Sequence, residues 1–200
     1  AKGGKPPMTD TAASPAPSAR RLVLMRHAQA APAPFGEMGQ HADMRRSLTP
    51  RGRDMAARCG AWLRERDFGP DLVLVSPALR TVQTLEAIGS FYGDRQPAIR
   101  HVNTLYDATT ATIRDMLYDI PDKFSNIIVL GHNPGLAALV CQWAAGRCPA
   151  ALEPALHRGF PPAAMACFTT GKPWNTAMDS EIRLQDLYCC LLYTSPSPRD

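Results

Sequence analysis

The chain lacks any hydrophobic run long enough to cross a bilayer. Its longest apolar stretch, Leu136 to Ala145 with Gln142 inside it, is much shorter than the roughly 20 residues that a transmembrane helix needs. No apolar segment of signal-peptide length precedes residue 21. These absences predict a chain without a membrane or secretory segment, which we expect to work in the cytoplasm.

Cysteine pairing motifs and a strong charge of one sign are also missing. None of the six cysteines forms a C-x-x-C pair, and the five histidines complete no zinc-binding pattern. Reduced thiols and no metal centre are therefore expected. The formal net charge is only +4, which suits an anionic substrate. An excess this small falls short of the basic surface of a nucleic-acid-binding protein.

What is present describes an ordinary globular domain. The chain has 200 residues, of which 45% are hydrophobic and 20% charged. A single domain of this size can bury about 70% of its unfolded surface. The Ala-, Pro- and Ser-rich residues 1–20 predict a disordered leader, and residues 189–200 a disordered or non-native tail. The folded domain is expected over residues 21–188.

Strand and helix patterns alternate within that domain. Short apolar runs typical of strands buried on both faces occupy residues 21–25, 72–75 and 126–130. Apolar residues at helical spacing predict helices over residues 50–66, 77–92, 109–118 and 134–145. Weaker strand signals occupy residues 163–169 and 181–187. The alternation predicts an α/β fold: a three-layer sandwich with a mostly parallel central sheet and helices on both faces.

Basic and polar side chains follow each of the three apolar strands. Because the carboxyl ends of parallel strands meet at one edge of a sheet, these side chains are expected to converge where open α/β folds bind ligands. Each alone would fit a polar strand end or a surface cation, and it is their concurrence that favours a site. They are Arg26 and His27 after the first strand, Ser76 and Arg80 after the second, and His132 and Asn133 after the third.

Helix N-termini are expected at the same edge. Ser76 and Asn133 each precede a proline, as Thr49 precedes Pro50, so all three are predicted to cap helices. We also expect Ser76 and Asn133 to contact the substrate. Arg80 would lie in the first turn of its helix, against the positive end of the helix dipole. That placement is favourable if an anion lies between the cation and the helix.

A pocket of this composition suits phosphoryl transfer, in which charge spreads over the equatorial oxygens. We expect a neutral His27 to attack phosphorus while Arg26 and Arg80 clamp the oxygens. His132 would donate a hydrogen bond to the developing charge. Water would then hydrolyse the phosphohistidine. No metal or other cofactor is required, because the guanidinium groups supply the positive charge.

Four blocks of the sequence resemble the histidine phosphatase superfamily, in the order that the family has them. The resemblance covers roughly residues 21–187 and implies a phosphoglycerate mutase-like fold. The compact branch of SixA-type phosphohistidine phosphatases is the most similar, since the chain lacks the insertions of the mutases. The blocks are Leu24–Ala28 (LMRHA), Asp43–Gly52 (DMRRSLTPRG), Ser76–Thr84 (SPALRTVQT) and Val129–Gly135 (VLGHNPG).

Carried over by position, the resemblance implies that His27 is the nucleophile and that Arg26, Arg80 and His132 complete the phosphate pocket. Ala28 stands where the family signature has Gly, and its methyl group could crowd the pocket.

The Glu that serves as general acid in the mutases has no clear counterpart in this chain. Asp107 lies near its place and is the candidate, although an Asp before Thr109 more often caps a helix. Because a protonated imidazole leaves phosphorus more readily than an alkoxide, a weak acid favours a phosphoramidate substrate.

Three functions stay open at this point. The leading hypothesis is a phosphatase acting on a phosphorylated protein, such as a histidine phosphotransfer domain, because a compact chain without a lid insertion leaves its pocket open. A small-molecule phosphomonoesterase or a phosphoglycerate mutase-like enzyme is the alternative. A non-catalytic phosphate-binding module is the third. Asp43 and Arg46 either pair at the pocket rim or belong to a charged loop.

Overall fold

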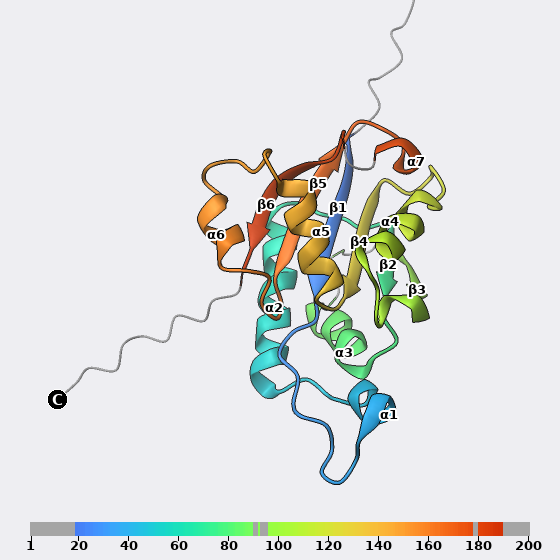
Figure 1. Cartoon of the computed structure of the whole chain (residues 1–200), viewed down its shortest axis with the longest axis vertical. Helices are drawn as coiled ribbons and strands as arrows, with labels where there is room; N and C mark the ends of the chain where they lie inside the picture. Colours follow the sequence, from blue (N-terminus) through green and yellow to red (C-terminus); the bar gives the residue numbers. More distant parts are fainter. Residues whose placement is uncertain (1–18, 90–91, 93–95, 178–179, 190–200) are drawn as a thin grey trace, which may run out of the picture.

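One sheet with helices on both faces makes up the domain. The computed structural model describes residues 19–89, 92, 96–177 and 180–189, so the predicted leader and tail lie almost wholly outside the described residues. Within them the α/β sandwich is confirmed (Figure 1). The strands are β1 (Arg20–Arg26), β2 (Leu72–Val75), β3 (Ala98–His101), β4 (Asn126–Gly131), β5 (Met165–Thr170) and β6 (Arg183–Tyr188).

The sheet has the order β3-β2-β4-β1-β5-β6. The first four strands in this order are parallel to one another, and three of them, β2, β4 and β1, are the apolar runs predicted from the sequence. Strand β5 runs antiparallel to β1, and β6 antiparallel to β5. The weak strand signals near the C-terminal end therefore form an antiparallel extension of the parallel sheet.

Helices cover the two faces and one edge. The predicted helix over 50–66 is confirmed as α2 (Pro50–Glu65), and that over 109–118 as α4 (Thr110–Tyr118). The sequence patterns did not predict α1, α6, α7, the 3₁₀ helix η1 or strand β3. The four helices are too short to show a periodic apolar pattern. Strand β3 is exposed along its whole length, so it has no apolar run. The remaining helices are α1 (Gly39–Met44), α3 (Leu79–Ile88), α5 (Gly135–Ala144), α6 (Glu153–His157), α7 (Trp174–Ala177) and η1 (Asn103–Leu105).

Two of the three predicted helix caps are wrong. Thr49 does cap α2, with its hydroxyl accepting from the Gly52 amide at 2.9 Å. Helix α3 begins at Leu79 and α5 at Gly135, and neither has a side-chain cap. The side chains of Ser76 and Asn133 instead make tertiary hydrogen bonds at the site described below, and both helices begin at least two residues after them.

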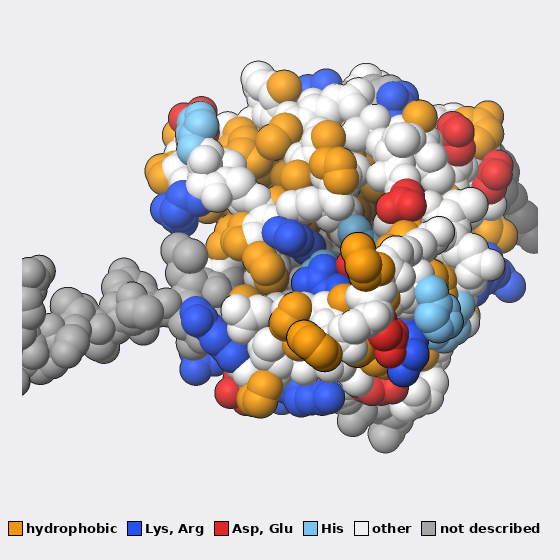
Figure 2. Space-filling view, turned by 60° about the horizontal axis from the view of Figure 1, so that its bottom comes forward, with side chains coloured by type: hydrophobic (Ala, Val, Ile, Leu, Met, Phe, Trp, Pro, Cys, Tyr) orange, Lys and Arg blue, Asp and Glu red, His pale blue; other side chains and the backbone are white. Residues whose placement is uncertain are grey.

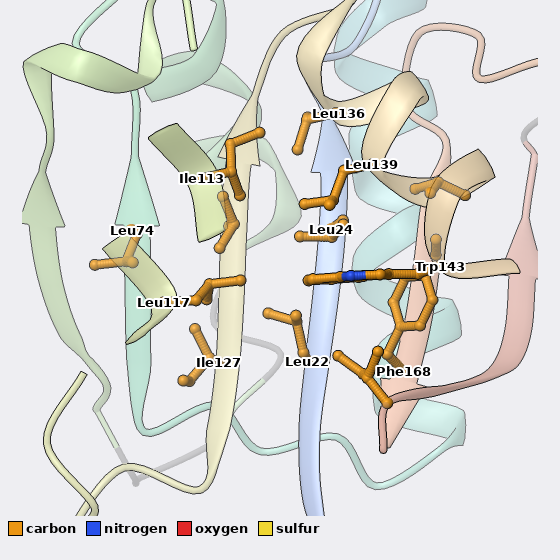
Figure 3. Close-up of a cluster of buried hydrophobic side chains, with 14 of the residues drawn as sticks. Leu22, Leu24, Leu74, Ile113, Leu117, Ile127, Leu136, Leu139, Trp143 and Phe168 are labelled. Atoms are coloured by element: carbon orange, nitrogen blue, oxygen red, sulfur yellow. The ribbon is translucent and has the colours of Figure 1, made fainter. Parts of the chain in front are cut away.

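The core lies in two layers, one on each face of the sheet. Leu22 and Leu24 of β1 face α4 and α5 (Figure 3). Val23 and Met25 belong to the other layer, which packs against α2 and α3. Strands β2 and β4 alternate in the same way, because successive residues of a strand point to opposite faces. A shift of the β1 register by one residue would move each of its side chains to the opposite face of the sheet. This register fixes where β1 ends.

Among the described helices, none combines the length and the apolar character needed to cross a membrane.

Candidate functional site

The strand-end side chains lie together at one edge of the sheet. In the register of β1 and β4, Arg26 is paired with Gly131, and the His27 amide donates to the Gly131 carbonyl at 3.1 Å. Strand β2 ends beside them, where the Ser76 amide donates to the Leu130 carbonyl at 3.0 Å. On the face that carries this edge, Arg and His side chains lie in a central hollow bordered by hydrophobic side chains (Figure 2).

His27 is held in one tautomer. Its Nδ1 atom lies 2.7 Å from the Ala28 carbonyl oxygen. Because a carbonyl only accepts, Nδ1 carries the hydrogen and Nε2 keeps its lone pair. Burial, together with the charges of Arg80 and Arg26, lowers the pKa of His27 to about 4 against the opposing effect of the Ala28 hydrogen bond. The imidazole is therefore neutral at neutral pH.

Ala28 does not crowd the pocket. Its methyl group is fully buried in the core layer against α2 and α3. Its amide donates to the Thr84 hydroxyl at 3.0 Å, and that hydroxyl donates to the Arg80 carbonyl at 2.6 Å. This residue thus links the end of β1 to helix α3, which carries Arg80.

His132 faces His27 across the site. The two ring centroids are 5.2 Å apart, and the His132 Nε2 atom is 2.7 Å from the Ser76 hydroxyl. The Ala78 amide approaches the same hydroxyl oxygen at 3.5 Å, so the hydroxyl hydrogen is free to point toward Nε2. When the hydroxyl donates to Nε2, the hydrogen of His132 lies on Nδ1. Burial and the charge of Arg80 lower the pKa of His132 to about 3.

The carbonyl oxygen of Phe160 positions one arginine of the site. It accepts from Arg26 Nη1 at 3.0 Å and from Asn133 Nδ2 at 2.8 Å. Burial and the charge of Arg80 lower the pKa of Arg26. The amide of Asn133 therefore supports the loop that holds Arg26.

Three buried nitrogen atoms of these side chains have no hydrogen-bond partner in the described part of the chain: Nε of Arg26, Nε of Arg80 and Nδ1 of His132. An unpaired buried polar group costs about 1–3 kcal/mol, so three in one pocket indicate a ligand rich in acceptor oxygens. A phosphate group has that composition. No cluster of three or more His, Cys, Asp or Glu in the described residues could hold a metal ion.

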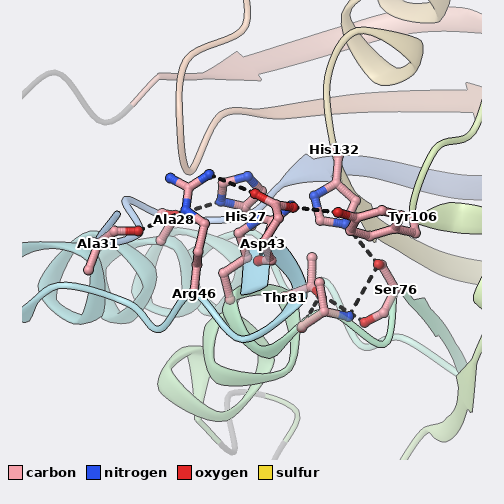
Figure 4. Close-up of polar contacts among 11 residues, drawn as sticks. His27, Ala28, Ala31, Asp43, Arg46, Ser76, Thr81, Tyr106 and His132 are labelled. Atoms are coloured by element: carbon pink, nitrogen blue, oxygen red, sulfur yellow. Dashed lines mark hydrogen bonds and ion pairs between the residues drawn. The ribbon is translucent and has the colours of Figure 1, made fainter. Parts of the chain in front are cut away.

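A second layer of polar side chains, which includes Asp43, Arg46 and Tyr106, lies beside the two histidines (Figure 4). Asp43 accepts from Arg80 Nη2 at 3.0 Å, from Arg46 Nη1 at 3.1 Å and from the Tyr106 hydroxyl. Of the two alternatives left open for Asp43 and Arg46, a pair at the pocket rim or a charged loop, the structure has the ion pair. Although burial raises it, hydrogen bonds from Tyr106 and Arg46 and the charge of Arg80 lower the pKa of Asp43 to about 2. Tyr106 is a site residue that the sequence patterns did not single out.

Two cavities open beside these groups and share Tyr106 and Asp107 in their walls. One, of about 430 Å³, reaches His132 and Asn133. The other, of about 550 Å³, extends toward α1 and η1. Asp107 is exposed at the junction. Its loop is set by close packing, since a Cβ atom on Gly135 would lie 2.0 Å from the Ala108 carbonyl oxygen.

Comparisons with known proteins agree with this geometry. The family model of branch 1 of the histidine phosphatase superfamily matches residues 22–105. An uncharacterized protein of Mycobacterium tuberculosis is 33% identical over 151 residues, which cover 75% of this chain and 89% of that protein.

Solved structures extend the likeness to most of the chain. A structure described as a candidate SixA phosphohistidine phosphatase from Nakamurella multipartitia is 30% identical, with a TM-score of 0.70, over 86% of this chain and 96% of that one. A mycobacterial glucosyl-3-phosphoglycerate phosphatase shares the fold, with 21% identity and a TM-score of 0.54 over 84% of this chain and 96% of that one. These matches reach beyond residue 105, to the half of the chain that carries His132.

Proposed function

The chain belongs to the histidine phosphatase superfamily, and from that premise we propose that it hydrolyses a phosphoryl group through a phosphohistidine formed on His27. Family membership and the SixA-like neighbour support a phosphatase. The observation that carries the proposal is the tautomer of His27. Its Nδ1–H is committed to the Ala28 carbonyl, which leaves the lone pair of Nε2 available to attack phosphorus in a pocket with unpaired donors.

In the first step Nε2 of His27 forms a bond to phosphorus as the bond to the leaving group breaks. The leaving group takes the electron pair of that bond together with a proton. Arg26 and Arg80 bind the equatorial oxygens, and His132 donates from Nδ1. Donors preorganised around developing charge in this way contribute about 10²–10³ each in rate.

In the second step a water molecule attacks the phosphorus of the phosphohistidine. The bond to Nε2 breaks, the electron pair returns to His27, and the water proton leaves with solvent or with the group that donated before. No metal takes part, since the charges of Arg26 and Arg80 offset those of the phosphoryl oxygens. His27 is then neutral again and ready for another cycle.

The remaining predicted site residues are Ser76, Asn133 and Asp107, which act on the other site residues or on the substrate away from phosphorus. Ser76 acts through His132, because its hydroxyl sets the hydrogen of that ring on Nδ1. Asn133 lines the cavity beside His132, and its unpaired Oδ1 can accept from the substrate. Asp107, exposed at the junction of the two cavities, is the candidate to protonate the leaving group.

A protein phosphohistidine is the substrate we favour. Two adjoining cavities open beside the site, and one of them reaches His132, which leaves room for a side chain that protrudes from a folded partner. Protonation of a leaving imidazole demands little of an acid, which fits an exposed Asp107. A phosphorylated histidine of a phosphotransfer domain meets both conditions.

A small phosphate ester is the second candidate. The cavity of about 430 Å³ beside His132 falls in the size range of small-molecule sites. The fold is shared with a structure described as a sugar-phosphoglycerate phosphatase, although that likeness concerns the fold alone.

Phosphate release from a phosphohistidine protein and from para-nitrophenyl phosphate, compared in wild type and His27→Ala, tests the proposal. Release from the protein substrate that disappears in the variant supports both nucleophile and substrate class. Release from the ester alone moves the substrate to small molecules. Phosphate or vanadate binding without any turnover would replace the enzyme with a non-catalytic binding module.

A further inference from the structure

Asp43 makes hydrogen bonds with Arg80, Arg46 and Tyr106. Its carbonyl oxygen accepts from Arg80 Nη1 at 2.7 Å, and its carboxylate accepts from Nη2 at 3.0 Å. The Arg80 side chain is 7% exposed and that of Asp43 35%. The buried guanidinium group is therefore held by two hydrogen bonds to Asp43, a more exposed residue at the pocket rim.

These two contacts occupy one edge of the guanidinium fork. The edge between Nη1 and Nη2 faces Asp43, and the edge that carries Nε is left without a partner although it is buried. A guanidinium group binds a phosphate in two parallel hydrogen bonds from one edge. With the end of the fork held by Asp43, the Nε edge is the edge of Arg80 that is left to bind a ligand.

The carboxylate of Asp43 is itself held in place. Arg46 donates to Oδ1, and Tyr106 donates to Oδ2. Arg46 is in turn fixed by the Ala31 carbonyl, which accepts from its Nε at 2.8 Å. The Tyr106 ring also lies 5.8 Å from the guanidinium carbon of Arg80 and packs edge-on to His132 at 5.6 Å. Helix α1 is thereby tied to the groups at the ends of β2 and β4.

We propose that Asp43 is a positioning residue for phosphoryl transfer, which holds Arg80 by the end of its fork so that the Nε edge is preset toward the phosphoryl oxygens. The inference rests on the proposed phosphatase function. Asp43 also supplies the anion that offsets the unfavourable placement of Arg80 in the first turn of α3. Misplacing a group that must meet the transition state costs rate even when the group itself is retained.

A double-mutant cycle tests this role. Asp43→Asn keeps the side-chain volume and the backbone contact to Arg80 but removes the charge. Turnover of para-nitrophenyl phosphate should fall by about 10- to 100-fold in Asp43→Asn and by about 10²–10³-fold in Arg80→Ala. The double variant should be no slower than Arg80→Ala, because Asp43 acts through the guanidinium group that is already gone.

Asp186→Asn is the matched control. Asp186 of β6 pairs with Arg66 at 2.9 Å, and its side chain is 35% exposed, as is that of Asp43. It lies outside the site, so turnover in this variant should equal that of wild type. A general loss of structure in Asp43→Asn would instead persist in the Arg80→Ala background.

The outcomes separate the two levels of the proposal. The positioning role would be overturned if Asp43→Asn lowered turnover equally in the wild-type and Arg80→Ala backgrounds, or if it left wild-type turnover unchanged. Either result would leave the phosphatase function intact. If wild type turns over nothing, the function fails, and the same cycle measured on the vanadate dissociation constant decides the role of Asp43. Absence of both turnover and vanadate binding in wild type would overturn both.

Discussion

Acid should destabilise this protein through the two histidines of the site. Their pKa values, about 4 for His27 and about 3 for His132, lie below the ordinary value of 6.5. Both are thus held neutral by the fold. In the unfolded chain both take up protons as soon as the pH falls below 6.5. The contribution of these two histidines to the free energy of unfolding must therefore fall between pH 6.5 and the folded pKa values, and it must level off below them.

The size of the effect follows from the pKa differences. From about pH 7.5 to about pH 5, each histidine removes on the order of 2 kcal/mol from the free energy of unfolding, so about 4 kcal/mol together. Asp43 does not contribute in this window. The pKa of its carboxyl is lowered from 3.8 to about 2, so the stability it adds is complete above 3.8 and is lost only in stronger acid.

Urea unfolding followed by tryptophan fluorescence at a series of pH values measures this dependence. His27→Gln and His132→Gln should each reduce the loss between about pH 7.5 and about pH 5 by on the order of 2 kcal/mol. Above about pH 7.5 the difference between each variant and wild type should be constant with pH, which provides an internal control. A wild-type stability that is flat across the window, or variants with the wild-type slope, would refute buried neutral histidines.

Three further substitutions probe the support of the site. Ser76→Ala should lower turnover by about 10-fold in a steady-state assay, because the His132 ring loses the partner that fixes its hydrogen on Nδ1; unchanged turnover would remove Ser76 from the scheme. Gly135→Ala should cost about 1–3 kcal/mol in chemical denaturation, since the new Cβ would lie 2.0 Å from the Ala108 carbonyl; equal stability would show that the loop moves freely. Leu24→Ala should cost about 2–5 kcal/mol in the same experiment, because Leu24 is fully buried under α5; a loss below about 1 kcal/mol would contradict the packing.

The parts of the fold that carry strong local patterns were predictable from sequence. Strands β1, β2 and β4 are buried on both faces and so appear as unbroken apolar runs. Their parallel arrangement places the residues that follow them at one edge, so the sequence alone predicts that His27 and His132 lie together. Strand β3 is exposed at the edge of the sheet, and no apolar run marks it.

Tertiary contacts account for what the sequence did not reveal. Asp43 reaches Tyr106 across 63 residues of chain, and helix α1, which carries Asp43, is too short to leave a periodic pattern. Local chemistry favours Ser76 and Asn133 as helix caps, but His132 and the Phe160 carbonyl bind those side chains instead. Capping preferences describe a helix end in isolation. In this pocket, tertiary hydrogen bonds take the place of the predicted capping bonds.

The central claim is that the phosphoryl group passes through His27, and trapping the intermediate tests it most directly. Wild-type protein would be mixed briefly with a radiolabelled phosphohistidine protein or aryl phosphate and quenched under alkaline conditions, and the labelled peptide identified by mass spectrometry. The account predicts a phosphoryl group on His27, lost in His27→Ala and still formed more slowly in His132→Ala. Turnover with no labelled enzyme, or label on His132 in place of His27, would contradict it.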